Sequence, residues 1–135
     1  MDDLAREVQR RYLDRLDDPK WQEEDPCLDF GPAALPYFVG AFNRPNIPAE
    51  QRSRLIRAIW QFRVPQALPT LAAALDDPCD DVWKDALDGL VTIGGVEAQQ
   101  ILQAARLKAG QLPQVDKLEW IDEAFEQVVE RLGHQ

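Results

Sequence analysis

The residues best suited to covalent or metal chemistry are few and far apart in this 135-residue chain. It has two cysteines, Cys27 and Cys79, one serine, Ser53, and one histidine, His134. A Ser-His-acid or Cys-His device needs an imidazole held in place, and His134 lies next to the last residue, where chains are usually mobile. These side chains also supply too few ligands for zinc. We therefore expect no catalytic residues, no bound metal or cofactor, no enzymatic activity, and inert thiols at both cysteines.

The charge balance narrows the class of partner. The chain carries 15 Lys and Arg against 24 Asp and Glu, a net charge of -9. Such a chain is poorly suited to the phosphate backbone of a nucleic acid or to an anionic membrane surface. The charge is also segregated: residues 76–97 hold seven acids and one base, whereas residues 31–75 hold one acid and five bases. This pattern favours another protein with a basic surface as the partner.

Length and composition predict one folded domain over residues 1–135. Hydrophobic residues make up 45% of the chain and charged residues 29%, as is typical of globular proteins. The first residues lack the pattern of a secretory signal, and no apolar run is long enough to cross a membrane. We therefore expect a monomeric, cytoplasmic protein with reduced thiols.

Apolar residues recur at helical spacing along the chain, and no alternating pattern predicts a strand. Prolines and glycines separate the periodic segments, and residues 18–31 resemble a loop. Asp2 or Asp3 is suited to cap the first helix, and Asp80 or Asp81 the fifth. The predicted helices cover residues 2–17, 32–42, 48–62, 65–75, 80–93, 98–110 and 118–132.

The helices form pairs that repeat. Ala34-Leu35-Pro36 is matched 33 residues later by Ala67-Leu68-Pro69, and the second helices align on Ala58, Ala86 and Ala124. A helix pair that repeats every 30 to 40 residues is typical of an α-solenoid. We predict a helix and acidic loop at 1–31 that cap the stack, and repeats at 32–64, 65–95 and 96–135.

The middle repeat carries a family resemblance. Its first helix contains Ala67-Leu68-Pro69-Thr70-Leu71, its turn is Leu75-Asp76-Asp77-Pro78, and its second helix has Val82, Ala86, Leu90 and Ile93-Gly94. This pattern resembles HEAT-like repeats of the type found in phycobilisome-lyase-related proteins. Trp83 departs from it, because that repeat usually has an arginine there. The resemblance covers residues 32–132 and implies an all-α, right-handed solenoid of about three HEAT-like helix pairs.

The resemblance also implies a class of function. HEAT-like folds are usually binding scaffolds whose second helices hold another protein on a concave surface. Small acidic members resemble immunity proteins that neutralise a basic toxin, and complementary charge would speed that encounter. The alternative is a phycobilin-lyase-like accessory protein that handles a tetrapyrrole, with Cys27 or Cys79 as its reactive group. A DNA-repair solenoid is disfavoured by the negative charge.

We expect the partner-binding surface on the second helices. Its charged residues are those of the second and third repeats: Asp81, Lys84, Asp85, Asp88, Glu123 and Glu126. In the repeat alignment, Trp60 stands opposite Asp88 and Glu126, and Ile56 stands opposite Lys84 and Asp122. Two apolar residues at otherwise charged positions predict a binding hot spot, with Arg52, Arg57 and Arg63 beside it.

Two alternatives stay open for this surface. The first helix, through Val8 and Tyr12, would cover Ile56 and Trp60 if they belong to the core. Arg52, Arg54, Arg57 and Arg63 are expected to share one helix, as a solvated face or paired with the acidic N-terminal segment.

Overall fold

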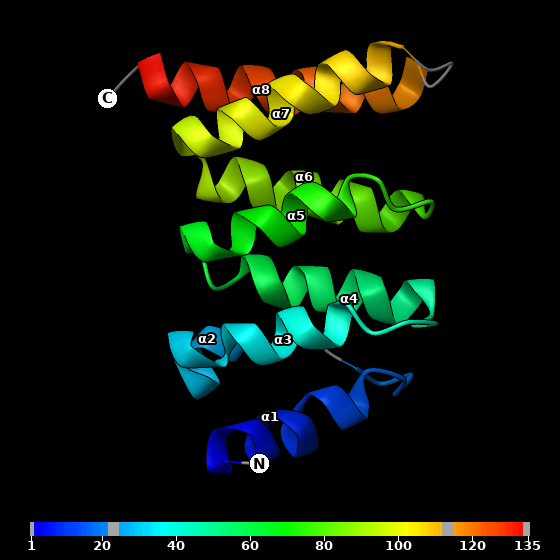
Figure 1. The fold of residues 1–135 in the computed structure, drawn as a ribbon, viewed down its shortest axis with the longest axis vertical. Helices are drawn as coiled ribbons and strands as arrows, with labels where there is room; N and C mark the ends of the chain where they lie inside the picture. The colour runs from blue at the N-terminus through cyan, green and yellow to red at the C-terminus, as the bar shows by residue number, and fades with distance from the viewer. Residues whose placement is uncertain (1, 22–24, 112–114, 134–135) are drawn as a thin grey trace.

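The computed structural model describes residues 2–21, 25–111 and 115–133 as a stack of helices, with no strand in these ranges (Figure 1). The first helices of the pairs lie in one layer and the second helices lie behind them. The predicted all-α solenoid is confirmed. In chain order the α-helices are α1 (Asp3–Arg11), α2 (Pro26–Phe30), α3 (Leu35–Phe42), α4 (Ala49–Trp60), α5 (Leu68–Ala74), α6 (Asp80–Ile93), α7 (Gly95–Gly110) and α8 (Val115–Gly133).

Proline and glycine set the boundaries of the repeats. Pro32 and Pro65 begin the 3-10 turns Pro32–Ala34 and Pro65–Ala67, which lead directly into α3 and α5. Proline suits a first turn, because the N–H that it lacks would have no partner there. Gly94 alone separates α6 from α7, with a φ of 65° that disfavours residues with a side chain. α7 therefore begins at Gly95, three residues before the predicted start.

A continuous core runs through the stack. Phe38 of α3 is fully buried and links the N-terminal segment to the first pair. Its ring centroid lies 4.9 Å from that of Tyr12 and 5.6 Å from that of Phe62. Each second helix buries apolar residues at helical spacing, among them Ile59, Leu90 and Val128. None of the described helices is long and apolar enough to span a membrane.

The N-terminal segment differs from the prediction. α1 ends at Arg11 instead of residue 17, and a 3-10 turn, Leu13–Arg15, follows. Arg54 of α4 donates hydrogen bonds to the carbonyls of Leu16 and Asp18, and these contacts hold the chain away from a helical path. Sequence periodicity does not contain such tertiary contacts.

The predicted loop at 18–31 contains α2. Asp25 caps this helix by accepting hydrogen bonds from the N–H groups of Cys27 and Leu28, with Pro26 as its first residue. Pro26 was interpreted as a loop residue, although proline after a capping aspartate is a helix-start pattern. Glu23 and Glu24, two acids of the predicted N-terminal loop, and His134 lie outside the described residues.

The N-cap of α1 is the predicted one, whereas the N-cap of α6 differs from the prediction. The Asp2 carboxylate accepts from the N–H of Ala5 at 2.7 Å and caps α1 as expected. Asp80 and Asp81 instead lie in the first turn of α6, and the N-cap is Cys79, whose side chain makes no cap bond. The Cys79 N–H donates to the Asp77 carboxylate at 2.9 Å, so the preceding aspartate satisfies one of the free N–H groups at this helix end.

The first and second repeats meet where α6 crosses α4 at Gly89. A Cβ atom built on Gly89 would lie 2.6 Å from the Cβ of Trp60 and 2.9 Å from Cδ1 of Leu71. These distances are shorter than van der Waals contact, so the two helices approach this closely because residue 89 has no side chain.

Substitution of Gly89 by alanine should therefore destabilise the stack. Overpacking of a filled contact costs about 1–3 kcal/mol. Gly40→Ala in α3 is the matched control, because a Cβ there meets no heavy atom within 4 Å. That change should stabilise the protein by about 0.5–1 kcal/mol through helix propensity. Urea unfolding of both variants measures the difference, and equal shifts in the two would contradict the close contact.

Candidate functional site

A groove of about 420 Å³ opens where α4, α6 and α8 meet. The indole rings of Trp60 and Trp120 line it together with two carboxylates, Asp88 and Glu123. We call it the Trp60–Trp120 groove. The other lining residues are Leu87, Val91, Thr92, Ala124 and Gln127.

Trp60 was predicted as a hot spot, and the structure places it half-buried in this groove. Its Cβ and Cγ pack on Gly89 of α6, so the next repeat supports it. The suggested cover, Tyr12, instead packs edge-on against Phe38 of α3. The indole N–H of Trp60 is buried and has no hydrogen-bond acceptor among the described residues. That donor is desolvated without compensation.

Trp120 is the groove residue that sequence reasoning missed. It is 46% exposed, a large value for a tryptophan. Its ring lies edge-on to Trp83 of α6, with 6.3 Å between the centroids, and the Nζ of Lys84 lies 4.7 Å from its centroid. The alignment on Ala86 and Ala124 puts Trp120 opposite Val82, which is fully buried, so the alignment gives no sign that Trp120 is exposed. Its spacing of three residues from Glu123 was the signal for a shared face.

The carboxylates of Asp88 and Glu123 are exposed and have no ion-pair partner within the part of the chain that the structure describes. Both were predicted site residues, and the structure brings them together with Trp60. Partial burial, followed by the nearby charge of Asp85, raises the pKa of the Asp88 carboxyl, and Arg57 offsets part of this rise. The groove therefore holds negative charge that the protein itself does not fully compensate.

Other predicted site residues connect the repeats internally. Arg52 donates to both carboxylate oxygens of Asp77, at 2.8 and 3.0 Å, and also to the carbonyl of Ile47. Burial of the Asp77 carboxyl would raise its pKa, but the Arg52 and Cys79 hydrogen bonds outweigh burial and lower it. This ion pair ties α4 to the turn before α6.

A second link joins α4 to α6 one turn further along. Arg57 donates to the Asp85 carboxylate at 3.1 Å, and the Ser53 hydroxyl donates to the same oxygen. Asp85 keeps only 14% of its side chain exposed. Ile56 lies between these residues and is fully buried, so its prediction as a partner contact is wrong.

The arginines do not form one solvated face. Arg54 pairs with Glu50 and reaches the N-terminal segment, as one alternative expected, but it binds backbone carbonyls there instead of acids. Arg63 lies beyond the end of α4 with a φ of 54°, so the expectation of one shared helix is wrong. Pro65 disfavours helical geometry at Val64, the residue directly before it, which is extended. Arg63 and Glu126 are exposed, and neither lines the Trp60–Trp120 groove.

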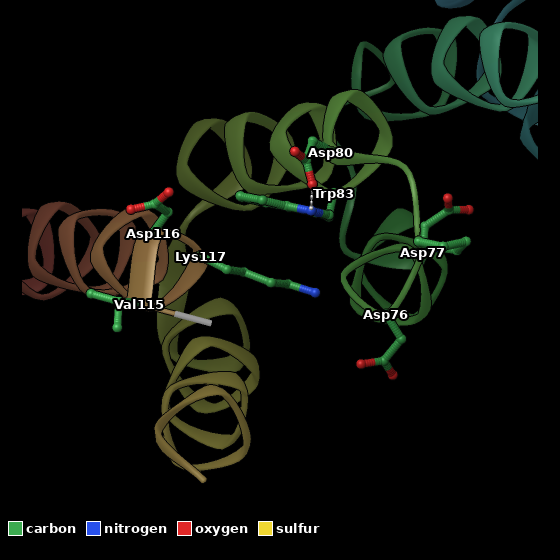
Figure 2. A pocket seen from close by; sticks show the side chains of 8 residues that line it. Asp76, Asp77, Asp80, Trp83, Val115, Asp116 and Lys117 are labelled. Atoms are coloured by element: carbon green, nitrogen blue, oxygen red, sulfur yellow. Dashed lines mark hydrogen bonds between the residues drawn. The ribbon is translucent and has the colours of Figure 1, made fainter. Parts of the chain in front are cut away.

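A second cleft, of about 510 Å³, lies between the α5–α6 turn and the start of α8. Figure 2 shows Lys117 extending from α8 into the space between Trp83 and the aspartates of the turn. Its Nζ donates to the carbonyl of Leu75 at 2.6 Å and lies 5.3 Å from the Trp83 centroid. Burial lowers the pKa of Lys117, while the charges of Asp76 and Asp80 oppose this shift. The protein thus places a cation of its own among the acids that line this cleft.

A third cleft, of about 640 Å³, lies between α4, the start of α6 and the N-terminal segment. Cys79, Trp21, Arg57 and Asp81 are among its lining residues. Asp81 is exposed there and so lies apart from Asp88 and Glu123. Over residues 2–21, 25–111 and 115–133, no three His, Cys, Asp or Glu side chains are grouped so that they could hold a metal ion.

Comparison with known protein families gives a match over more than half of the chain. A family model described as HEAT repeats matches residues 33–113, which include all of α3 to α7. No curated protein and no solved structure gives a match.

Asp88→Asn should stabilise the free protein at neutral pH. Because the folded state raises the pKa of Asp88 above 3.8, it binds this proton more tightly than the unfolded chain does. The ionised carboxylate therefore disfavours folding above the raised pKa, and this penalty disappears as the pH falls through it. The gain at pH 7 should stay within about 0.5 kcal/mol, because the residue is exposed. Thermal unfolding across this range tests the sign; a gain that persists in acid contradicts it.

Trp60 should tolerate phenylalanine far better than alanine. Trp60→Phe keeps an aromatic ring on Gly89 and removes an indole donor that has no acceptor, so the stability should change by less than about 1 kcal/mol. Trp60→Ala removes the ring and should cost about 3 kcal/mol, the low end of the range for buried aromatic residues. Chemical denaturation measures both. If phenylalanine costs as much as alanine, the indole N–H has a partner.

Proposed function

Because the chain belongs to the HEAT repeat family, we propose that it binds a basic surface of another protein along α4, α6 and α8. HEAT repeats generally mediate protein–protein interaction and are usually non-enzymatic scaffolds. The proposal gives this chain the same role, with no reaction of its own and no nucleic-acid or lipid partner. Its net charge of -9 supports a basic partner.

The Trp60–Trp120 groove is the observation that carries this proposal. Exposed tryptophan is uncommon on a surface with no partner, and Trp is among the residue types most enriched in binding hot spots. Here a tryptophan that is 46% exposed lies beside two carboxylates without ion-pair partners in the described chain. A basic partner would cover the ring and neutralise the charge at the same time.

The more specific form of the proposal is an inhibitor of the immunity-protein kind. Such a protein neutralises a basic toxin by covering its active surface, and opposite charge accelerates the encounter. The acids near α6 and α8 suit this role, since they lie on the helices that form the groove. A monomeric protein in the cytoplasm would meet such a toxin there.

Handling of a tetrapyrrole has weaker support. The third cleft offers a thiol, Cys79, and an aromatic ring, Trp21. Its arginines are already used, however: Arg54 binds Glu50 and two backbone carbonyls, and Arg57 binds Asp85. The carboxylates of Glu50 and Asp81 in the same lining would repel the propionates of a pigment. The residues present therefore do not fit that group.

The proposed function predicts that association with the partner is salt-dependent. The tagged protein is used to capture the partner from cell extract, and the captured partner is identified and purified. The rate at which the two proteins associate is then measured at about 0.1 M and at about 1 M salt. Screening shortens from about 10 Å to about 3 Å over this range, so the rate should fall at least tenfold. Asp29→Asn, at an exposed residue of α2, is the matched control for Asp88→Asn; only the latter should slow association. An acidic partner, or a rate that ignores salt, contradicts the proposal.

A further inference from the structure

We propose that the Trp60–Trp120 groove receives one arginine side chain of the partner protein. The guanidinium lies against the indole rings and donates to the carboxylates of Asp88 and Glu123. This inference rests on the proposed function in one respect: it takes the partner to be a protein with a basic surface.

The first support is that this fold repeatedly holds its own arginines by an aromatic ring together with a carboxylate. Arg106 lies with Cζ 4.3 Å from the Phe125 centroid while its Nε donates to Asp122 at 2.7 Å. Arg54 lies 5.0 Å from the Trp21 centroid and pairs with Glu50 at 2.8 Å. In both places a planar cation covers a ring and reaches a carboxylate.

The Trp60–Trp120 groove also combines aromatic rings with carboxylates, but no arginine of the described residues lies in it. It has two indole rings and two carboxylates, and within the described residues no Lys or Arg lines it. Lys84 lies over Trp120 at 4.7 Å and over Trp83 at 5.6 Å, which shows that the Trp120 indole accepts a positive charge. The charge of Arg57 also acts on Asp88, but Arg57 forms its ion pair with Asp85. Because Lys84 makes no ion pair with Asp88 or Glu123, both carboxylates stay available to a guest.

Arginine fits this groove better than lysine or an apolar side chain. A guanidinium is planar, stacks on aromatic faces, and carries five N–H donors that can serve two carboxylates on different helices. Lysine offers a compact, strongly hydrated charge that does not stack. An apolar side chain would match the rings but would desolvate Asp88 and Glu123 without a partner.

The groove can be tested with small probes before the partner is known. The probe is a blocked Gly-Arg-Gly peptide, and its control is the same peptide with citrulline, which keeps the shape and removes the charge. NMR of the indole N–H signals reports on the four tryptophans, which Trp→Phe variants assign. The arginine peptide should shift the Trp120 signal in a saturable way and leave Trp21 unchanged. The citrulline peptide should bind at least about tenfold more weakly.

Matched variants identify the carboxylates that bind. Glu123→Gln should weaken the arginine peptide three- to tenfold. Glu130→Gln removes the same charge from an exposed position on α8 outside the groove and should have no effect. Unchanged urea midpoints confirm that both variants are folded. Equal binding of the citrulline peptide, equal effects of the two variants, or no saturable shift of Trp120 would each overturn the inference.

The purified partner separates this inference from the proposed function. If Asp88→Asn combined with Glu123→Gln leaves the affinity for a basic partner unchanged, the arginine site is wrong and the proposed function stands. If the partner is acidic, the proposed function fails whatever the peptide shows. Loss of at least tenfold in affinity for a basic partner, with no loss in Glu130→Gln, supports both.

Discussion

The close approach of α6 to α4 at Gly89 determines how the first two repeats pack and where the Trp60–Trp120 groove lies. The missing side chain lets the two helices meet at the Cβ of Trp60, and this contact holds the indole at the edge of the groove. The short separation of α4 and α6 also brings Asp77 within hydrogen-bonding reach of Arg52, and Asp85 within reach of Arg57 and Ser53. A larger residue at position 89 would push α6 away from α4 and so separate these partners, since the contact there is already filled.

Most of the fold could be predicted from the sequence because residues within each repeat mark where its helices begin and end. Proline opens the first helices, and Gly94 separates α6 from α7. The apolar period then specifies which faces pack. The early end of α1 could not be predicted, because its cause is Arg54, which reaches the carbonyls of Leu16 and Asp18 from α4. α2 could have been predicted from Asp25-Pro26, a helix start that was interpreted as loop.

The site was less predictable, because alignment compares residue types and not their surroundings. Ile56 stands opposite Lys84, and a charged residue there suggested an exposed position. Lys84 is itself half-buried, however, since its long stem lets the ammonium reach the rings of Trp83 and Trp120. A charge at one repeat therefore does not predict exposure at the next. The structure brings Asp88, Glu123 and Trp60 to one groove because the second helices lie side by side.

The two joints on either side of α6 differ mechanically. Hydrogen-bonded ion pairs with fixed directions fasten α4 to α6 and its preceding turn. Between α6 and α8 the described residues form no ion pair. Arg131 of α8 donates a hydrogen bond to the carbonyl of Val91, and the other contacts include the edge-on rings of Trp83 and Trp120 with lysines lying over them. Directional bonds resist sliding, whereas ring contacts keep most of their energy when one surface shifts along the other. The joint between α4 and α6 thus has more directional bonds than the joint between α6 and α8, and the groove lies across both, so its α8 wall is fastened by fewer such bonds than its α4 wall.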